Sequence, residues 1–363
     1  MNDLDSRIKE IDYMKAICAL SVIWIHATAG YVEYSDFAYM TNQISRYAVP
    51  MFILLSGFGL FLSEKKKRNA PILSFYKKRV DKILIPYILW SLIYFVFANR
   101  HQLLATEWTV QAAKLAKQLF MGTAFVHLYF LIIMIQLYVL FPLLKKWMEE
   151  KPNAVLVASF LVTLGFHVGL YAHATQIFLL PSLGVPYVIL FPVWMFYFAM
   201  GMYMAKKADR VFGIIQHAAL GKTFWLWLLA LVVLVMDSKM TNTFASSTKP
   251  STLFYTAISF VFLYKCAGFI QNSTRAEAFF SWFSTHSFFI YLLHPLIISV
   301  LAQYFPSTFT EEFGVYLMLA IAICISLVVT YLCSYVKYIR FWGGVYAPAV
   351  RSRSTVPEHS VGK

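Results

Sequence analysis

Ten apolar runs follow one another along the sequence. They occupy residues 11–32, 44–63, 82–98, 127–144, 154–171, 187–205, 223–237, 252–271, 284–303 and 313–336. A helix needs about 20 mostly apolar residues to cross the hydrocarbon core of a bilayer. Only 13% of the residues are charged, whereas a soluble domain carries roughly 25%. The sequence therefore predicts an all-α, polytopic membrane protein with about ten transmembrane helices.

The distribution of basic residues predicts how the chain is oriented, because Lys and Arg collect on the cytoplasmic side of membrane proteins. With both termini in the cytoplasm, 25 of the 31 Lys and Arg residues fall in cytoplasmic segments. The remaining six are Arg46, Arg100, Lys114, Lys117, Lys239 and Lys249. The inverse orientation would reverse this ratio, so we expect both termini in the cytoplasm.

The net charge of +14 is the one feature that points toward nucleic acid. Its densest part lies between the second and third apolar runs. It comprises Lys65, Lys66, Lys67, Arg68, Lys77, Lys78, Arg79 and Lys82. Anionic lipid headgroups attract such clusters beside membrane helices. We therefore expect the lipid bilayer as a partner, and no nucleic acid.

The chain shows no internal repeat and no Gly/Ser-rich or Pro-rich linker. We expect one membrane-embedded domain over residues 1–345, followed by a polar, disordered cytoplasmic tail over residues 346–363. In the long outer loop 99–126, apolar and polar residues alternate with helical period from Trp108 to Met121. This pattern predicts a helix that lies in the plane of the membrane interface.

The first apolar run carries three ionisable residues, Asp12, Lys15 and His26. At membrane depth such residues are costly and usually line a path inside the protein. Helical geometry places all three on one face, spread over roughly 16–21 Å of rise. One interpretation is a polar track from the cytoplasmic end toward the outer half of the membrane. An equally good one is that Asp12 and Lys15 only form an ion pair, and a neighbouring helix satisfies His26.

Two further histidines occupy notable positions. His127 opens the fourth run on the predicted outer side, and His294 lies in the ninth run before Pro295, which cannot donate a backbone hydrogen bond. Structural roles are expected for His101, His167, His173, His217, His286 and His359. No two histidines have HxxxH spacing, so no metal site is predicted.

These residues resemble those of the acyltransferase-3 family, integral membrane O-acyltransferases. The first span of that family carries an acidic residue, a basic residue and, after ten intervening residues, a histidine, as Asp12, Lys15 and His26 do here. Further similar segments are Lys78–Pro86, His127–Leu131, Phe196–Gly201 and Ser287–Pro295. The resemblance extends from about residue 8 to residue 340.

The sequence departs from the family pattern at two positions, because the family usually has arginine where Lys15 and Lys82 stand. Lysine keeps the charge but loses the forked geometry of a guanidinium. Some members carry an additional soluble, hydrolase-like domain. We expect none in this chain. Within the family, this arrangement most resembles the O-succinyltransferase type associated with intercellular adhesin polysaccharide.

The resemblance implies transfer of an acyl group, acetyl or succinyl, from cytoplasmic acyl-CoA to hydroxyls of an extracytoplasmic glycan. Acyl-CoA would be a co-substrate, with no other cofactor. A cell-surface glycan or a lipid-linked sugar would be the acceptor. The protein would lie in a bacterial cell membrane, and a polysaccharide synthesis complex would be a further partner. The alternative is an exporter that moves the polysaccharide or lipid-linked sugar without covalent chemistry.

The expected roles follow from the chemistry of each side chain. An imidazole such as His26 gains and loses a proton near neutrality, which suits a general base or a transient acyl carrier. Asp12 would hold Lys15 in place on the same track. The remaining roles are donor binding by Lys78, Arg79 and Lys82, and support on the acceptor side by His127 and His294.

Overall fold

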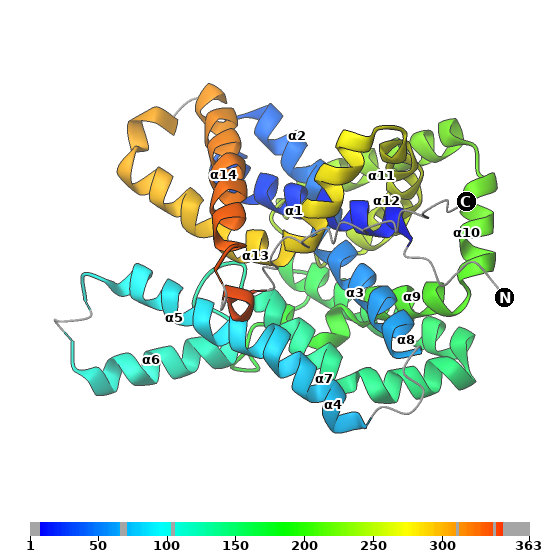
Figure 1. Cartoon of the computed structure of the whole chain (residues 1–363), viewed down its shortest axis with the longest axis horizontal. Coiled ribbons are helices and arrows are strands. Elements are labelled where there is room, and N and C mark those ends of the chain that lie inside the picture. The colour runs from blue at the N-terminus through cyan, green and yellow to red at the C-terminus, as the bar shows by residue number, and fades with distance from the viewer. Residues whose placement is uncertain (1–7, 66–70, 103–105, 310–311, 337–338, 344–363) are drawn as a thin grey trace, which may run out of the picture.

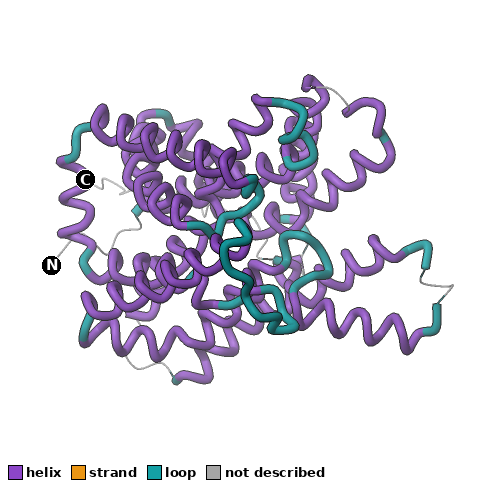
Figure 2. Tube along the Cα trace, turned by 180° about the vertical axis from the view of Figure 1, so that it is seen from behind, coloured by secondary structure: helices purple, strands orange, loops and turns teal. Residues whose placement is uncertain are grey.

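The computed structural model of the chain describes residues 8–65, 71–102, 106–309, 312–336 and 339–343. Every regular element within these ranges is helical (Figure 1). Figure 2 shows the same helices from behind, with loops confined to the connections between them. The predicted all-α, polytopic class is confirmed. The predicted tail over residues 346–363 lies outside the described residues, and the single-domain organisation stays a prediction.

The elements follow the chain in a simple order. The α-helices are α1 (Lys9–Thr28), α2 (Asp36–Ile44), α3 (Ala48–Lys65), α4 (Ile72–Arg79), α5 (Ile85–Asn99), α6 (Trp108–Met121), α7 (Tyr129–Glu150), α8 (Pro152–Ala174), α9 (Met195–Lys206), α10 (Ala208–His217), α11 (Leu220–Thr241), α12 (Pro250–Gly268), α13 (Thr274–Tyr304) and α14 (Glu312–Cys333). Shorter 3₁₀ segments are Ser45–Tyr47, Tyr187–Ile189, Phe191–Val193, Phe269–Asn272, Pro306–Phe309 and Ile339–Trp342, and Val80–Leu84 is a π-helical turn.

Eight stretches of the described chain are helices long and apolar enough to cross a membrane. They are Asp36–Lys65, Ile72–Asn99, Tyr129–Glu150, Pro152–Ala174, Leu220–Thr241, Pro250–Asn272, Thr274–Tyr304 and Phe313–Cys333. The two other predicted spans coincide with α1 and α9. Polar side chains interrupt the apolar sequence of α1, and the 12 residues of α9 rise only about 18 Å. The side of the membrane on which the termini lie stays a prediction.

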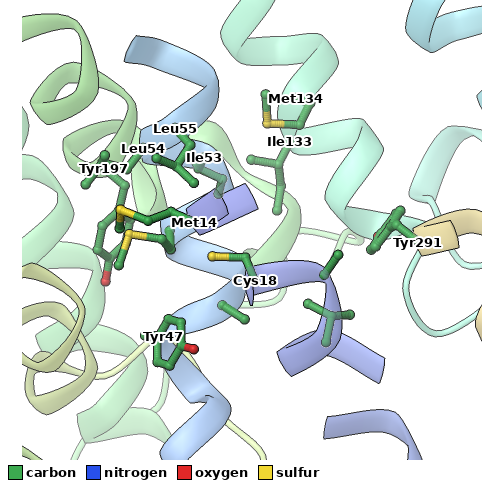
Figure 3. Close-up of a cluster of buried hydrophobic side chains, with 14 of the residues drawn as sticks. Met14, Cys18, Tyr47, Ile53, Leu54, Leu55, Ile133, Met134, Tyr197 and Tyr291 are labelled. Carbon is green, nitrogen blue, oxygen red and sulfur yellow. The ribbon is translucent and has the colours of Figure 1, made fainter. Parts of the chain in front are cut away.

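Helix α1 lies in the middle of the fold and packs against α3, α12, α13 and α14 (Figure 1). Its Met14 and Cys18 are fully buried in an apolar cluster with Leu54 of α3 and Tyr197 of α9 (Figure 3). Large apolar side chains instead remain exposed along α8, α11 and α14. Exposed apolar surface of this extent on peripheral helices is expected to face lipid. Within α1, Asp12 is buried, and Lys15 and His26 are only partly exposed.

Helices α3 and α9 approach each other so closely that two glycines are required. A Cβ on Gly201 would stand 2.0 Å from the carbonyl oxygen of Leu54, and a Cβ on Gly57 would stand 2.3 Å from that of Phe198. Small residues allow such backbone contacts between membrane helices, where dispersion forces drive association. The α3–α9 pair is thus a fixed frame for the helices that carry the site.

The amphipathic segment predicted between residues 99 and 126 forms a helix. Helix α6 begins at Trp108 and ends at Met121, where Gly122 adopts the left-handed conformation. Trp108 and Phe120 are largely exposed. This is consistent with a helix that lies along a membrane interface.

Candidate functional site

Two adjoining cavities lie beside the part of α1 that carries Lys15. The larger has a volume of about 410 Å³ and the smaller about 360 Å³. Both are lined by Lys15, Leu55, Ser56, Arg79, Lys82 and Tyr138. Three of these six residues are basic, so the two cavities share a positively charged mouth.

The basic residues reach this mouth because of the local backbone between α4 and α5. The turn Val80–Leu84 is π-helical, which widens the helix and displaces the residues after it relative to a regular α-helix. Lys78 lines the smaller cavity, Arg79 and Lys82 line both, and Asp81 lines the larger. The structure thus brings the three predicted donor-binding residues together around one opening.

Arg79 is held in place by two aromatic rings. Its guanidinium carbon lies 5.2 Å from the ring centre of Phe75 and 5.4 Å from that of Tyr138. Its Nε is buried without a hydrogen-bond partner. The stacked guanidinium therefore keeps donor capacity for a ligand.

The ion pair expected within α1 is present. Lys15 Nζ lies 3.1 Å from Asp12 Oδ1, and Asp12 is buried. Lys15 nevertheless lines both cavities, with a third of its side chain exposed. The ion pair of the second interpretation is therefore present, and the polar track of the first stays a prediction, because Lys15 lines the two cavities and His26 lines neither.

The three candidate histidines form a cluster, although they come from distant parts of the chain. The ring centre of His26 lies 5.3 Å from that of His294 and 6.4 Å from that of His127. The rings of His127 and His294 are 6.0 Å apart. His127 and His294 are buried, whereas His26 is partly exposed. His26 is therefore the accessible member of the cluster.

The end of α1 that carries His26 is fixed by α2. Asn42 Nδ2 donates to the carbonyl of Ile25 at 3.0 Å and to the hydroxyl of Thr28 at 2.8 Å. These bonds satisfy polar groups in the last turn of α1, where helix carbonyls lack partners within the helix. Asn42 is fully buried. His26 therefore stands on a rigid helix end.

His294 lies in α13 at a point where the backbone hydrogen bonding of that helix is interrupted. Pro295 lies within that helix, and the hydroxyl of Tyr94 enters the helix there. It donates to the carbonyl of Leu292 at 2.7 Å and accepts from the amide of Leu296 at 3.0 Å. Nδ1 of His294 lies 3.1 Å from the carbonyl of Ile290, which favours a proton on Nδ1.

The buried histidines keep unused hydrogen-bonding atoms. In the described part of the chain, Nε2 of His294 and both ring nitrogens of His127 are buried with no hydrogen-bond partner. Buried polar atoms without partners are rare in folded proteins and point to a function or to a bound group. The cluster therefore keeps hydrogen-bonding capacity for a bound group.

Tyr291 connects the cavity to the cluster. Its side chain lines the larger cavity, and its ring centre lies 5.1 Å from that of His127. Its hydroxyl donates to the carbonyl oxygen of His127 at 2.5 Å. One aromatic ring thus separates the inner end of the cavity from the histidines. This residue lies in the segment Ser287–Pro295, but sequence reasoning gave it no role.

Two buried histidines outside the cluster have backbone partners. His167 lies between the carbonyls of Val193 and Lys249, at 3.0 and 3.2 Å, and His286 Nδ1 lies 2.8 Å from the carbonyl of Trp282. Within the described ranges, no group of three or more His, Cys, Asp or Glu side chains is placed to hold a metal ion. The site is therefore built from imidazoles and basic side chains.

These features define a multi-pass membrane protein with a cavity lined by basic residues and a histidine cluster that packs against Tyr291 in the wall of that cavity. A family model described as an acyltransferase domain matches residues 8–339. Since this match covers nearly all of the sequence, the chain belongs to the acyltransferase-3 family.

Curated relatives extend this assignment. Proteins of Staphylococcus aureus strains MRSA252, MSSA476 and N315 are each 25% identical over 348 residues, which cover 88% of this chain and 90% of the relative. Each is named a probable poly-beta-1,6-N-acetyl-D-glucosamine export protein. No solved structure matches the chain. The predicted family and the location in a bacterial membrane are thereby confirmed.

Proposed function

We propose that the protein transfers an acyl group from cytoplasmic acyl-CoA to a hydroxyl of an extracytoplasmic polysaccharide, which we take to be a poly-β-1,6-N-acetyl-D-glucosamine. The observation that carries this proposal is that the cavity lined by basic residues ends at Tyr291, whose ring packs against the cluster of three histidines. The family and the names of the relatives support the class of reaction and the class of acceptor.

The donor fits the chemistry of the cavity lining. Lys78, Arg79 and Lys82 would bind the phosphates of CoA by charge-assisted hydrogen bonds. Beyond the mouth the larger cavity is mainly apolar, with Phe130, Leu131 and Met134 along its wall, and would accept the extended thioester arm. Lys15 and His26 are 11 residues apart on α1, which is about 16 Å of rise. An extended arm spans such a distance.

The transfer step needs one base and one leaving group. His26 would take the proton of the sugar hydroxyl while the hydroxyl oxygen attacks the thioester carbonyl carbon. A carbon–oxygen bond forms, the carbon–sulfur bond breaks, and the proton passes from His26 to the CoA thiolate. His127 and His294 would orient the acceptor through their unpartnered ring nitrogens.

Export without covalent chemistry is the second candidate, because the relatives are named as export proteins. One experiment separates the two functions. We expect cells that lack the gene to display the polymer outside but without ester-linked acyl groups, as measured by mass spectrometry of surface glycans. Polymer that fails to reach the outside would instead support export. A role in a synthesis complex without its own chemistry would leave the esters on exported polymer intact.

Donor binding is tested by Arg79→Ala. Loss of a charge-assisted bond to phosphate is expected to weaken acyl-CoA binding about tenfold to a hundredfold. Equilibrium binding of acyl-CoA to the purified full-length protein in lipid nanodiscs measures this effect. Arg210→Ala is a matched control, because Arg210 is an exposed cation on α10 that lines neither cavity. Unchanged affinity in Arg79→Ala would remove this assignment.

A further inference from the structure

A buried arginine lies beside the histidine cluster, although no role was predicted for it. Arg46 follows α2 in the 3₁₀ segment Ser45–Tyr47 and is only 7% exposed. Its guanidinium is linked to the backbone beside His26 through Asn42, which accepts a hydrogen bond from Arg46 and donates one to the carbonyl of Ile25. From the sequence alone, Arg46 is one of six basic residues outside the predicted cytoplasmic segments.

The guanidinium of Arg46 has no anionic partner in the described part of the chain. Nη1 donates to the carbonyl of Ala245 at 2.8 Å, and Nη2 donates to Oδ1 of Asn42. Both acceptors are neutral, and Nε is buried with no partner. No carboxylate forms an ion pair with Arg46 among the described residues. A buried charge without a partner is costly and points to an anion that arrives with the substrate.

A second set of bonds fixes the orientation of this guanidinium. The loop that supplies the Ala245 carbonyl is held down by Lys249, whose Nζ donates to Ser238 Oγ and lies 3.5 Å from Asp237 Oδ2. Asn42 is itself bonded to the last turn of α1. Arg46 is therefore held relative to His26 before any substrate binds, and such preorganised donors are most effective at stabilising developing charge.

We propose that Arg46 stabilises the oxyanion of the transfer reaction, a role that rests on the proposed function. When the sugar hydroxyl attacks, the carbonyl π electrons move onto the acyl oxygen, which becomes negative in the tetrahedral intermediate. The Nε–H of Arg46 donates to that oxygen. When the carbonyl re-forms, the carbon–sulfur bond breaks and CoA leaves.

The position of Arg46 favours this role over recognition of a carboxylate at the end of the acyl chain. The thioester carbonyl must lie beside His26 in every reaction, because His26 activates the attacking hydroxyl. A terminal carboxylate would lie farther away by the length of the acyl chain, and an acetyl group has none. If Arg46 stabilises the oxyanion, its contribution to the rate is therefore the same for every acyl group.

The test compares Arg46→Gln with the wild-type protein in nanodiscs, with acetyl-CoA and succinyl-CoA as donors and a β-1,6-linked N-acetylglucosamine oligosaccharide as acceptor. We expect kcat to fall about a hundredfold to a thousandfold with both donors, while equilibrium binding of acyl-CoA is unchanged. Lys239→Gln removes a more exposed cation of the predicted outer side and is expected to leave kcat unchanged. Should Arg46→Gln not accumulate, Arg46→Met carries the same expectation without burying a new polar group.

The other outcomes contradict the proposal in distinguishable ways. A loss confined to succinyl-CoA would show that Arg46 recognises a carboxylate on the acyl chain. A kcat equal to that of the wild type would remove Arg46 from the reaction. Wild-type protein that transfers neither acyl group would overturn the proposed function, and this inference with it.

Discussion

Replacing His26 by alanine is expected to lower the rate of acyl transfer about a thousandfold, which is a typical contribution of a positioned general base. His26 is the partly exposed ring of the histidine cluster. His127 precedes α7 and His294 lies on α13, and both side chains are buried. We therefore expect that neither His127 nor His294 takes over the role of His26 in the His26→Ala variant.

The measurement is the ester content of surface glycan from cells that produce the variant in place of the wild type. His101→Ala is the matched control, because His101 is an exposed histidine in the loop between α5 and α6. Equal amounts of wild-type and variant protein in the membrane show that the fold is intact. Glycan with a normal ester content from the His26→Ala cells would end the proposed mechanism.

The lengths of the apolar runs predicted most of the fold, because the thickness of the bilayer sets the length of a helix that crosses it. Eight of the ten predicted runs appear as long apolar helices of the described chain. The run at 187–205 appears instead as two 3₁₀ segments and the short helix α9. Pro186 precedes the first 3₁₀ segment, and Pro192 lies in the second. Proline lacks the backbone N–H that a continuous helix needs.

The site was predictable only in part. Helical periodicity places Lys15 and His26 on one face of α1, and the resemblance to the family adds Arg79, His127 and His294. Periodicity does not say which helices become neighbours, so the roles of Tyr291 and Arg46 could not be inferred. These two residues acquire a role only through α13 and the loop after α11, which are remote from α1 in sequence.

The π-helical turn at Val80–Leu84 had no sequence signal either. A regular helix places Lys78 and Lys82 one turn apart, with Asp81 about 60° away from Lys78. In the structure Arg79, Asp81 and Lys82 all line the larger cavity. Such turns occur often at functional sites. The π-helical turn therefore lies beside the candidate site, at a place where periodicity assumes a regular helix.

The second large effect is expected on stability. The methyl group that Gly201→Ala introduces should force α3 and α9 apart. The Cβ introduced by Gly201→Ala would stand 2.0 Å from the carbonyl oxygen of Leu54 and 2.8 Å from the amide nitrogen of Phe58. Both atoms belong to the backbone of α3, so no change of side-chain rotamer relieves the clash. We expect a loss of roughly 3 kcal/mol or more in the free energy of unfolding, at the upper end for overpacked cores.

Thermal unfolding of the purified protein, followed by the loss of its monodisperse elution, measures this effect. Gly165→Ala in α8 is the matched control, because a Cβ there meets no atom within 4 Å and alanine favours the helix by about 1 kcal/mol. The consequence for function follows from α3, since Leu55 and Ser56 of that helix line both cavities. Displacing α3 widens the mouth, so any folded Gly201→Ala protein should also bind acyl-CoA more weakly. A Gly201→Ala protein with wild-type stability would mean that α3 and α9 are not in backbone contact.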